Sequence, residues 1–281
     1  MREAVDRHLR AAGVAGAPLR WARLSRAGVE ALHARGLDLA VLPCGAVEQH
    51  GPHLPIETDV AIAEAVALWG SALSGVPVLP TLAYGNSLGH TDRWPGTLSL
   101  SPVTLIQTVR EIGAWFVRGG GRRLLLLNAH FGNDAPLRCA IDHLRTEYDG
   151  RLLVGLSNTW TLSARAREAY LLDGADIHAN RAETSLMLAL DPEAVVGAAA
   201  ADDPDRTDGL VFTHPVSRTS VNGVTGRPSE ASAAEGEALL RALDARLLEH
   251  GGEVFAERPP IPGPGDERPP IPDSPHQEAS R

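Results

Sequence analysis

Carboxylates and histidines gather within residues 44–59, which read CGAVEQHGPHLPIETD. Glu48 and His50 are two positions apart at the end of an expected strand, so an extended backbone would point both side chains the same way. Asp59 comes just before an expected helix and could turn back toward them. This mixture of carboxylate and imidazole donors suits Zn²⁺, Mn²⁺ or Fe²⁺. A polar loop with incidental histidines, here His53 as well as His50, is the alternative.

Two further segments carry the same kinds of side chain. In NAHFGN, His130 follows an apolar run, at the sheet edge where open α/β folds bind ligands, or else it simply caps a strand. In DIHANRAE, His178 precedes Glu183 at a helix start, where a glutamate can also serve ordinary capping. Together the three segments supply at least three carboxylates and three imidazoles, enough for a two-metal site with a bridging carboxylate.

The elements that must position these side chains alternate between strand and helix. Short apolar runs predict strands at residues 37–42, 76–79, 124–127 and 152–156. Helices are expected within residues 1–36, at 60–73, 102–118, 133–148 and 183–190, and from a capping box at Ser232 and Glu235 to about residue 250. This alternation predicts an α/β protein with a largely parallel sheet covered by helices.

Composition excludes several classes of protein. The 281 residues carry a formal charge of −9, and all 26 basic residues are arginine, which rules out lysine Schiff-base chemistry. The acidic balance argues against a nucleic-acid partner. No long apolar run predicts a membrane span or a signal peptide. With only two cysteines, Cys44 and Cys139, the chain has no disulfide framework, and a cytoplasmic location is expected.

The end of the chain differs from the rest. The sequence ERPPIP occurs at residues 257–262 and again at 267–272, in a stretch with few apolar side chains. Residues 1–255 are therefore expected to form a single catalytic domain. Residues 256–281 are expected to form a Pro-rich, disordered tail.

The motifs GAVEQHGPHLPIETD, NAHFGN and HANRAETSLMLAL resemble the creatininase (creatinine amidohydrolase) family over about residues 42–240. The loop that carries Tyr84, Gly85, Ser87, His90 and Pro95-Gly96-Thr97 fits the same pattern. The resemblance implies a three-layer α/β/α sandwich with a mostly parallel sheet. It also implies a homo-oligomer and a hydrolase of C–N bonds that holds two divalent ions (Zn, Fe or Mn) in each subunit and uses a hydroxide shared between them.

The resemblance also implies roles for particular residues. The metal ligands would be Glu48, His50, Asp59, His130 and Glu183, with Asp59 bridging the ions. His178 would be the nearby acid/base, and Glu183 a second catalytic group. His90, Trp94 and His53 are the candidates for substrate contact, although packing alone would also explain His53 and Trp94.

Within the family, HANRAETSLMLALDPEAV is most similar to the peptidases of mycofactocin biosynthesis, which remove a C-terminal dipeptide from a modified precursor peptide. Creatininases carry a metal-binding glutamate two residues after the histidine of the NxH motif, where this chain has Gly132. A peptide is therefore the expected substrate. A creatinine-like small amide is the alternative, and a non-catalytic binding protein on the same scaffold is a third possibility.

Two nucleophilic alternatives also remain open at this stage. GNSLG at residues 85–89 matches the G-x-S-x-G pattern of serine hydrolases, which requires Ser87 on a sharp strand-to-helix turn. Cys44 could act as a nucleophile or ligand, although a small buried cysteine is the commoner case.

Overall fold

The computed structural model describes residue 10 and residues 16–243. Three parallel strands form its sheet, in the spatial order β1 (Leu39–Cys44), β2 (Arg123–Asn128) and β3 (Leu153–Asn158). The strands pair in register, with Leu42 opposite Leu126 and Leu126 opposite Leu156. All three strands therefore end at the same edge of the sheet, where β1 and β2 lead into two of the candidate segments.

Side chains alternate between two apolar cores along the strands, as the period of two requires. Ala40, Leu42 and Leu126 pack on one face with α4 and α5, while Leu127 packs on the other face with α3 and α7. Burial of both faces explains why the strands are continuous apolar runs with no polar alternation.

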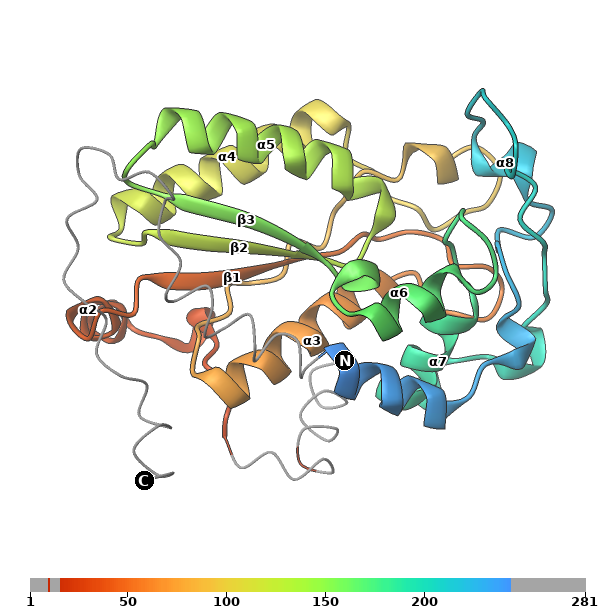
Figure 1. Ribbon diagram of the computed structural model, residues 1–281, viewed down its shortest axis with the longest axis horizontal. Coiled ribbons are helices and arrows are strands. Elements are labelled where there is room, and N and C mark those ends of the chain that lie inside the picture. The colour runs from red at the N-terminus through yellow and green to blue at the C-terminus, as the bar shows by residue number, and fades with distance from the viewer. Residues whose placement is uncertain (1–9, 11–15, 244–281) are drawn as a thin grey trace.

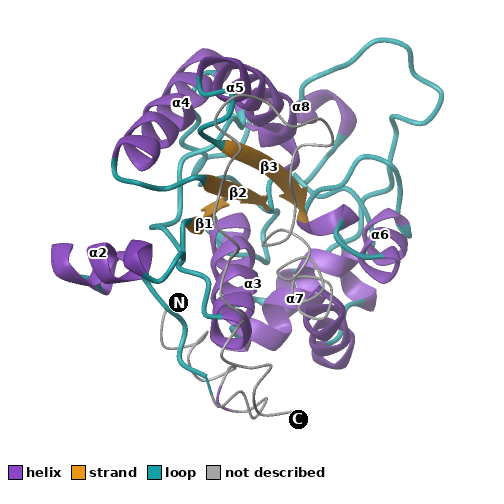
Figure 2. Ribbon diagram, turned by 60° about the vertical axis from the view of Figure 1, so that its left-hand side comes forward, coloured by secondary structure: helices purple, strands orange, loops and turns teal. Residues whose placement is uncertain are grey.

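Helices cover both faces and complete a three-layer α/β/α sandwich (Figure 1). Turned by 60°, the sheet again lies between α4 and α5 on one side and α3 and α7 on the other (Figure 2). In chain order the labelled α-helices are α2 (Arg26–Ala34), α3 (Thr58–Ser74), α4 (Pro102–Arg118), α5 (Asp134–Glu147), α6 (Ala164–Leu171), α7 (Arg181–Leu190) and α8 (Val216–Thr219). The expected fold class is confirmed.

Most expected elements are present with shifted ends, but the expected strand at 76–79 is wrong. Val78 makes only isolated parallel bridges, to Val41 and Arg20. Pro77 and Pro80 flank it and cannot donate to a ladder, which keeps the pairing short. The sequence also gave no indication of α6.

At the C-terminal end of the described chain, residues 233–243 are helical, and the Oγ of Ser232 accepts a hydrogen bond from the backbone N–H of Glu235 at 3.2 Å. The rest of that expected helix and the ERPPIP repeats lie outside the described residues, so the Pro-rich tail and the domain boundary at residue 255 stay predictions. Among the described residues, no helix is long and apolar enough to cross a bilayer.

Candidate metal centre

The carboxyl ends of β1 and β2 and the first turns of α3 and α7 converge on one cluster of side chains. β1 leads into the loop that carries Glu48 and His50, and β2 ends two residues before His130. Asp59 and Glu183 lie in the first turns of their helices. Each of the six candidate side chains is at most 5% exposed: Glu48, His50, Asp59, His130, His178 and Glu183.

A tight turn brings His178 and Glu183 to the same cavity. Ala179 has a φ of +49°, a left-handed conformation that is uncommon for residues other than glycine. Asn180 then caps α7, because its Oδ1 accepts a hydrogen bond from the backbone N–H of Glu183 at 3.1 Å. The backbone of His178 is fixed from the other side, since its carbonyl accepts from the N–H of Thr225 at 2.8 Å. These three constraints together direct the side chains of His178 and Glu183 into the cavity.

Asp59 lies between two histidines. Its Oδ1 is 3.3 Å from Nε2 of His50, and its Oδ2 is 3.1 Å from Nδ1 of His130. Three groups of side chains have donor atoms within 4.8 Å of one another: Glu48–Asp59–His130, His50–Asp59–Glu183 and Glu48–His50–His178. The first two groups share Asp59, so the geometry can accommodate two ions joined by this carboxylate.

Backbone carbonyls orient the imidazoles of His50 and His130. Nδ1 of His50 lies 3.1 Å from the carbonyl oxygen of Glu48, and Nε2 of His130 lies 2.8 Å from that of Asn86. A carbonyl can only accept, so each of these nitrogens carries a hydrogen, and the other ring nitrogen, which faces Asp59, is the one that can offer a lone pair to a cation. Metal-ligating histidines are usually held in this way by their second nitrogen.

Three carboxylates in the cluster keep oxygen atoms without hydrogen-bond donors. These buried atoms are Glu48 Oε2, Asp59 Oδ2 and Glu183 Oε2. Leaving a buried, ionised oxygen unsatisfied is costly. Two cations that shared Asp59 would satisfy all three, so these side chains fit a metal centre better than a structural hydrogen-bond network.

The electrostatics of the cluster favour positive charge. Burial lowers the pKa of His50, but Asp59 and two glutamates outweigh it and raise the pKa to about 10. Burial also lowers the pKa of His130, but the charges of Glu48 and Asp59 outweigh it and raise the pKa to about 9. Burial raises the pKa of Glu183 and outweighs the attraction of His50, and the charge of Asp59 adds a smaller contribution in the same direction as burial. Divalent cations that bound here would displace these protons, which couples metal binding to proton release.

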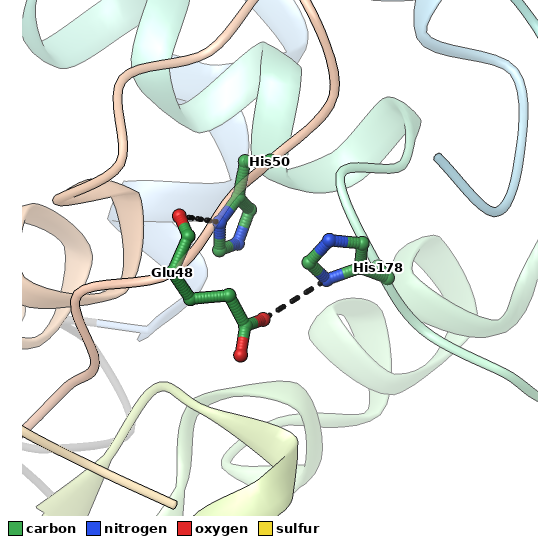
Figure 3. Close-up of side chains that lie close together, drawn as sticks. All are labelled: Glu48, His50 and His178. Atoms are coloured by element: carbon green, nitrogen blue, oxygen red, sulfur yellow. Dashed lines mark hydrogen bonds and ion pairs between the residues drawn. The ribbon is translucent and has the colours of Figure 1, made fainter. Parts of the chain in front are cut away.

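His178 faces Glu48 but is held differently from the other two histidines. Its Nδ1 lies 3.2 Å from Glu48 Oε1, whereas His50 contacts the backbone oxygen of Glu48 (Figure 3). Nε2 of His178 lies 3.0 Å from Nε2 of Gln49. Both ring nitrogens of His178 are thus engaged within the protein.

The cluster forms the floor of a cavity of about 270 Å³. His90 lines this cavity, with its Nε2 3.8 Å from Glu48 Oε1. Apolar side chains form part of the wall, among them Leu88 and Phe131, which are 53% and 51% exposed. The dimensions suit a small amide or a short peptide end. A larger groove of about 840 Å³ beside α4 contains none of the candidate residues.

Two predicted substrate contacts lie elsewhere. The His53 ring is buried against α7, with Nε2 2.9 Å from the Oγ1 of Thr184, and it is not among the residues that line the cavity. Trp94 is half-buried beneath the guanidinium of Arg93, which lies 5.0 Å from the ring centroid, and it does not line the cavity either.

The nucleophilic alternatives lack the required geometry. Ser87 is followed by only three residues of 3₁₀ helix, not by the helix of a nucleophile elbow. Its Oγ lies 3.2 Å from Nε2 of His130, but that nitrogen donates to the Asn86 carbonyl and has no lone pair to act as a base. Cys44 is fully buried, and burial raises the pKa of its thiol to about 12.

Sequence reasoning missed the polar residues that hold the loops together. Asn133 connects two of them: its Nδ2 donates to the Gly45 carbonyl at 3.0 Å, and its Oδ1 accepts from the N–H of Asn86 at 2.9 Å. Gln49 contacts both His90 and His178. The only local signal was that Gln49 lies between two candidate ligands.

Gly132 approaches its neighbours closely. A Cβ at this position would lie 2.3 Å from the Asn86 carbonyl oxygen and 2.6 Å from Nε2 of His130. Position 132 therefore leaves no room for a side chain in this backbone arrangement, and a carboxylate cannot reach the cluster from it.

The creatinine amidohydrolase (creatininase) family model matches residues 22–250, so the chain belongs to the creatininase family. A creatinine amidohydrolase of Pseudomonas putida is 34% identical over 244 residues, covering 80% of this chain and 93% of that protein. A mycofactocin precursor peptide peptidase of Mycolicibacterium smegmatis is 33% identical over 227 residues, covering 74% of this chain and 81% of that protein. The two relatives are almost equally distant.

Solved creatininase structures share the fold. A mutant creatininase of the Zn–Zn type superposes with a TM-score of 0.75 at 30% identity, covering 84% of this chain and 98% of that one. A creatininase described as the Mn form gives a TM-score of 0.75 at 31% identity, with the same coverage. The chain is thus a creatininase-family hydrolase whose relatives include zinc and manganese forms.

Proposed function

We propose that this protein is a binuclear metal-dependent amidohydrolase that acts on the C-terminal end of a modified peptide of the mycofactocin-precursor type. The observation that supports the metal centre most strongly is the position of Asp59, whose two oxygens face ring nitrogens of His50 and His130. In this proposal Glu48, Asp59 and His130 hold one ion, and Asp59, His50 and Glu183 hold the other.

Two divalent cations, once bound, supply Lewis acidity and lower the pKa of a water molecule from 15.7 to about 7. The protein residues then handle binding and proton transfer. His178 lies between the cluster and the cavity, with its Nδ1 beside Glu48. It is therefore placed to carry a proton from the cluster to the departing amine, while the acyl half gains the hydroxyl group. General acid–base help of this kind is worth about 10²–10⁴-fold in rate.

The choice of a peptide over creatinine rests on Gly132. The creatininase pattern places a carboxylate ligand at this position, and here the backbone leaves no space for one. The apolar wall that includes Leu88 and Phe131 offers contact area for a side chain of a peptide substrate. Hydrolysis of a creatinine-like small amide is the second candidate, because the creatininase of Pseudomonas putida is as similar as the peptidase.

One assay separates these substrates. Metal-loaded protein is incubated with a mycofactocin-type modified precursor peptide and, in parallel, with creatinine, and products are followed by mass spectrometry. We expect release of a C-terminal dipeptide that stops on chelation and returns with Zn²⁺ or Mn²⁺. Turnover of creatinine alone would overturn the peptide assignment, and chelator-resistant turnover would overturn the metal mechanism.

A further inference from the structure

Gln49 lies between Glu48 and His50 in the sequence, and its side chain is only 4% exposed. Its amide group lies beside two histidines of the cavity. Its Nε2 lies 3.0 Å from Nε2 of His178 and 3.1 Å from Nδ1 of His90. The rings of the two histidines contact each other in a tilted arrangement, with centroids 4.2 Å apart and planes 51° to each other. One amide group thus contacts both imidazoles at the cavity wall.

Two backbone groups determine which way round the amide lies. The N–H of Gly51 donates to Gln49 Oε1 at 3.0 Å, and the carbonyl of Gly223 accepts from Gln49 Nε2 at 3.2 Å. A flipped amide would place two donors against each other at Gly51 and two acceptors against each other at Gly223. The N–H of Gly51 can only donate and the carbonyl of Gly223 can only accept, so the NH₂ group of Gln49 must face the histidines.

The two glycines are suited to holding the amide. Gly223 has a φ of +82°, and a Cβ there would lie 2.3 Å from Gln49 Oε1. Gly51 also has a positive φ, of +65°. The loop around Gly223 is itself fixed, because its N–H donates to the Oγ of Ser220 at 2.8 Å. The amide therefore lies in a rigid backbone cradle.

An NH₂ group can only donate, so the histidine nitrogens that face it must accept. One hydrogen of Gln49 Nε2 is directed to Gly223, and the other is shared by Nε2 of His178 and Nδ1 of His90. The remaining nitrogens then carry the hydrogens. Both point to Glu48 Oε1, from His178 Nδ1 at 3.2 Å and from His90 Nε2 at 3.8 Å.

We propose that Gln49 is a positioning residue that fixes the tautomers of His178 and His90, keeps His178 off the metals and aims its Nδ1–H at Glu48. This inference rests on the proposed function only for the role of His178 in proton transfer. The inference also distinguishes between the three groups of side chains that could hold a metal ion. With both nitrogens occupied, His178 has no lone pair for an ion, so Glu48–His50–His178 is not a metal site and the two groups that share Asp59 remain.

The test uses protein labelled with ¹⁵N-histidine and loaded with Zn²⁺, which is diamagnetic. Long-range ¹H–¹⁵N correlation spectra report which ring nitrogen carries the hydrogen, and a His178→Asn variant assigns the signal. We expect Nδ1–H for His178 in the wild type and loss of that preference in Gln49→Met. Gly223→Ala should have the same effect, because its Cβ displaces the amide while Gln49 remains. Gln107→Met, at an exposed glutamine of α4, is the matched control and should change nothing.

Activity and metal content provide the second readout. Gln49→Met should keep its bound Zn²⁺ and its KM within about threefold, while kcat falls about 10–100-fold, the range for residues that orient a metal site. An Nε2–H tautomer in the wild type, or an unchanged Nδ1–H tautomer in Gln49→Met, would overturn the inference. The spectra require no turnover, so failure of the proposed function would leave this test decisive.

Discussion

Oδ2 of Asp59, in the first turn of α3, lies 3.1 Å from Nδ1 of His130, directly beyond β2. On the opposite side the second oxygen of the same carboxylate faces His50 at 3.3 Å. One helix start thus connects the two halves of the cluster, and each half has one further carboxylate of its own, Glu48 or Glu183. This arrangement allows each half to be perturbed separately.

Glu183→Gln should lose the ion held by His50, Asp59 and Glu183 and keep the other ion. His130→Ala should lose the ion held by Glu48, Asp59 and His130 and keep the first. Each substitution deletes a donor from one half only, while Asp59 stays in place. Metal content of protein purified without chelators, measured by plasma mass spectrometry, gives the count. Glu30→Gln, at an exposed glutamate of α2, is the control and should bind both ions. Retention of both ions in either cluster variant would contradict the ligand assignment.

Gly132→Ala should sharply reduce activity and lower metal affinity. The added Cβ would lie 2.3 Å from the Asn86 carbonyl, which orients His130, so that ring must shift. Misplacement of about 1 Å near the reacting groups can cost about 10²-fold. Titration with Zn²⁺ and steady-state kinetics measure both effects. The comparison is Gly197→Ala, where no atom lies within 4 Å of the added Cβ and where wild-type behaviour is expected.

Asn180→Ala should cost more than the roughly 1 kcal/mol of a lost N-cap in the free energy of unfolding, because its Nδ2 also donates to the Tyr170 carbonyl at 2.9 Å. It should also weaken metal retention, because the cap fixes the first turn of α7 and with it Glu183. Ser163→Ala removes the side-chain cap of α6, at a residue that does not line the cavity, and should cost about 1 kcal/mol without affecting metal. Denaturant unfolding and metal titration separate the two effects. Equal metal affinity in both variants would show that the cap plays no part in placing Glu183.

The stability of the metal-free protein should fall as the pH drops from about 6.5 to about 4. Burial, with smaller contributions from His50 and His178, lowers the pKa of His53 to about 4, against about 6.5 in an unfolded chain. In that interval the unfolded chain binds the proton and the folded chain does not, so unfolding becomes more favourable. Each unit of difference in pKa is worth at most about 1.4 kcal/mol.

Denaturant unfolding with a chelator at several pH values measures this loss. His53→Gln keeps a polar group beside Thr184 without a group that titrates here, so its stability should depend less on pH. If the free energy of unfolding changed with pH equally in the wild type and in His53→Gln, His53 would not contribute to the pH dependence.

The sequence predicted much of the sheet and the cluster because both depend on local patterns. Uninterrupted apolar runs such as residues 124–127 identified strands buried on both faces, and parallel strands place their following residues at one edge. The sequence therefore predicts His130 near the segment that follows β1. The five residues that the resemblance implied as ligands do lie together, buried, at that edge.

The rest depends on contacts that no local pattern shows. Gln49 is held partly by the carbonyl of Gly223, and the partner of His53 is Thr184 on α7. Both contacts join segments far apart in the chain. Hydropathy alone predicts a strand around Val78, but the flanking prolines lack the N–H groups that a continuous ladder needs, so only isolated bridges form there.

The central claim is that each chain binds two divalent ions joined by Asp59. The most direct test is the metal stoichiometry of wild-type protein and of Asp59→Ala, measured by plasma mass spectrometry after purification without chelators and reloading with Zn²⁺. We expect two ions per chain in the wild type, and loss of both, with nearly all activity, in Asp59→Ala. Two ions and full activity in Asp59→Ala, or no stoichiometric metal in the wild type, would contradict the binuclear assignment.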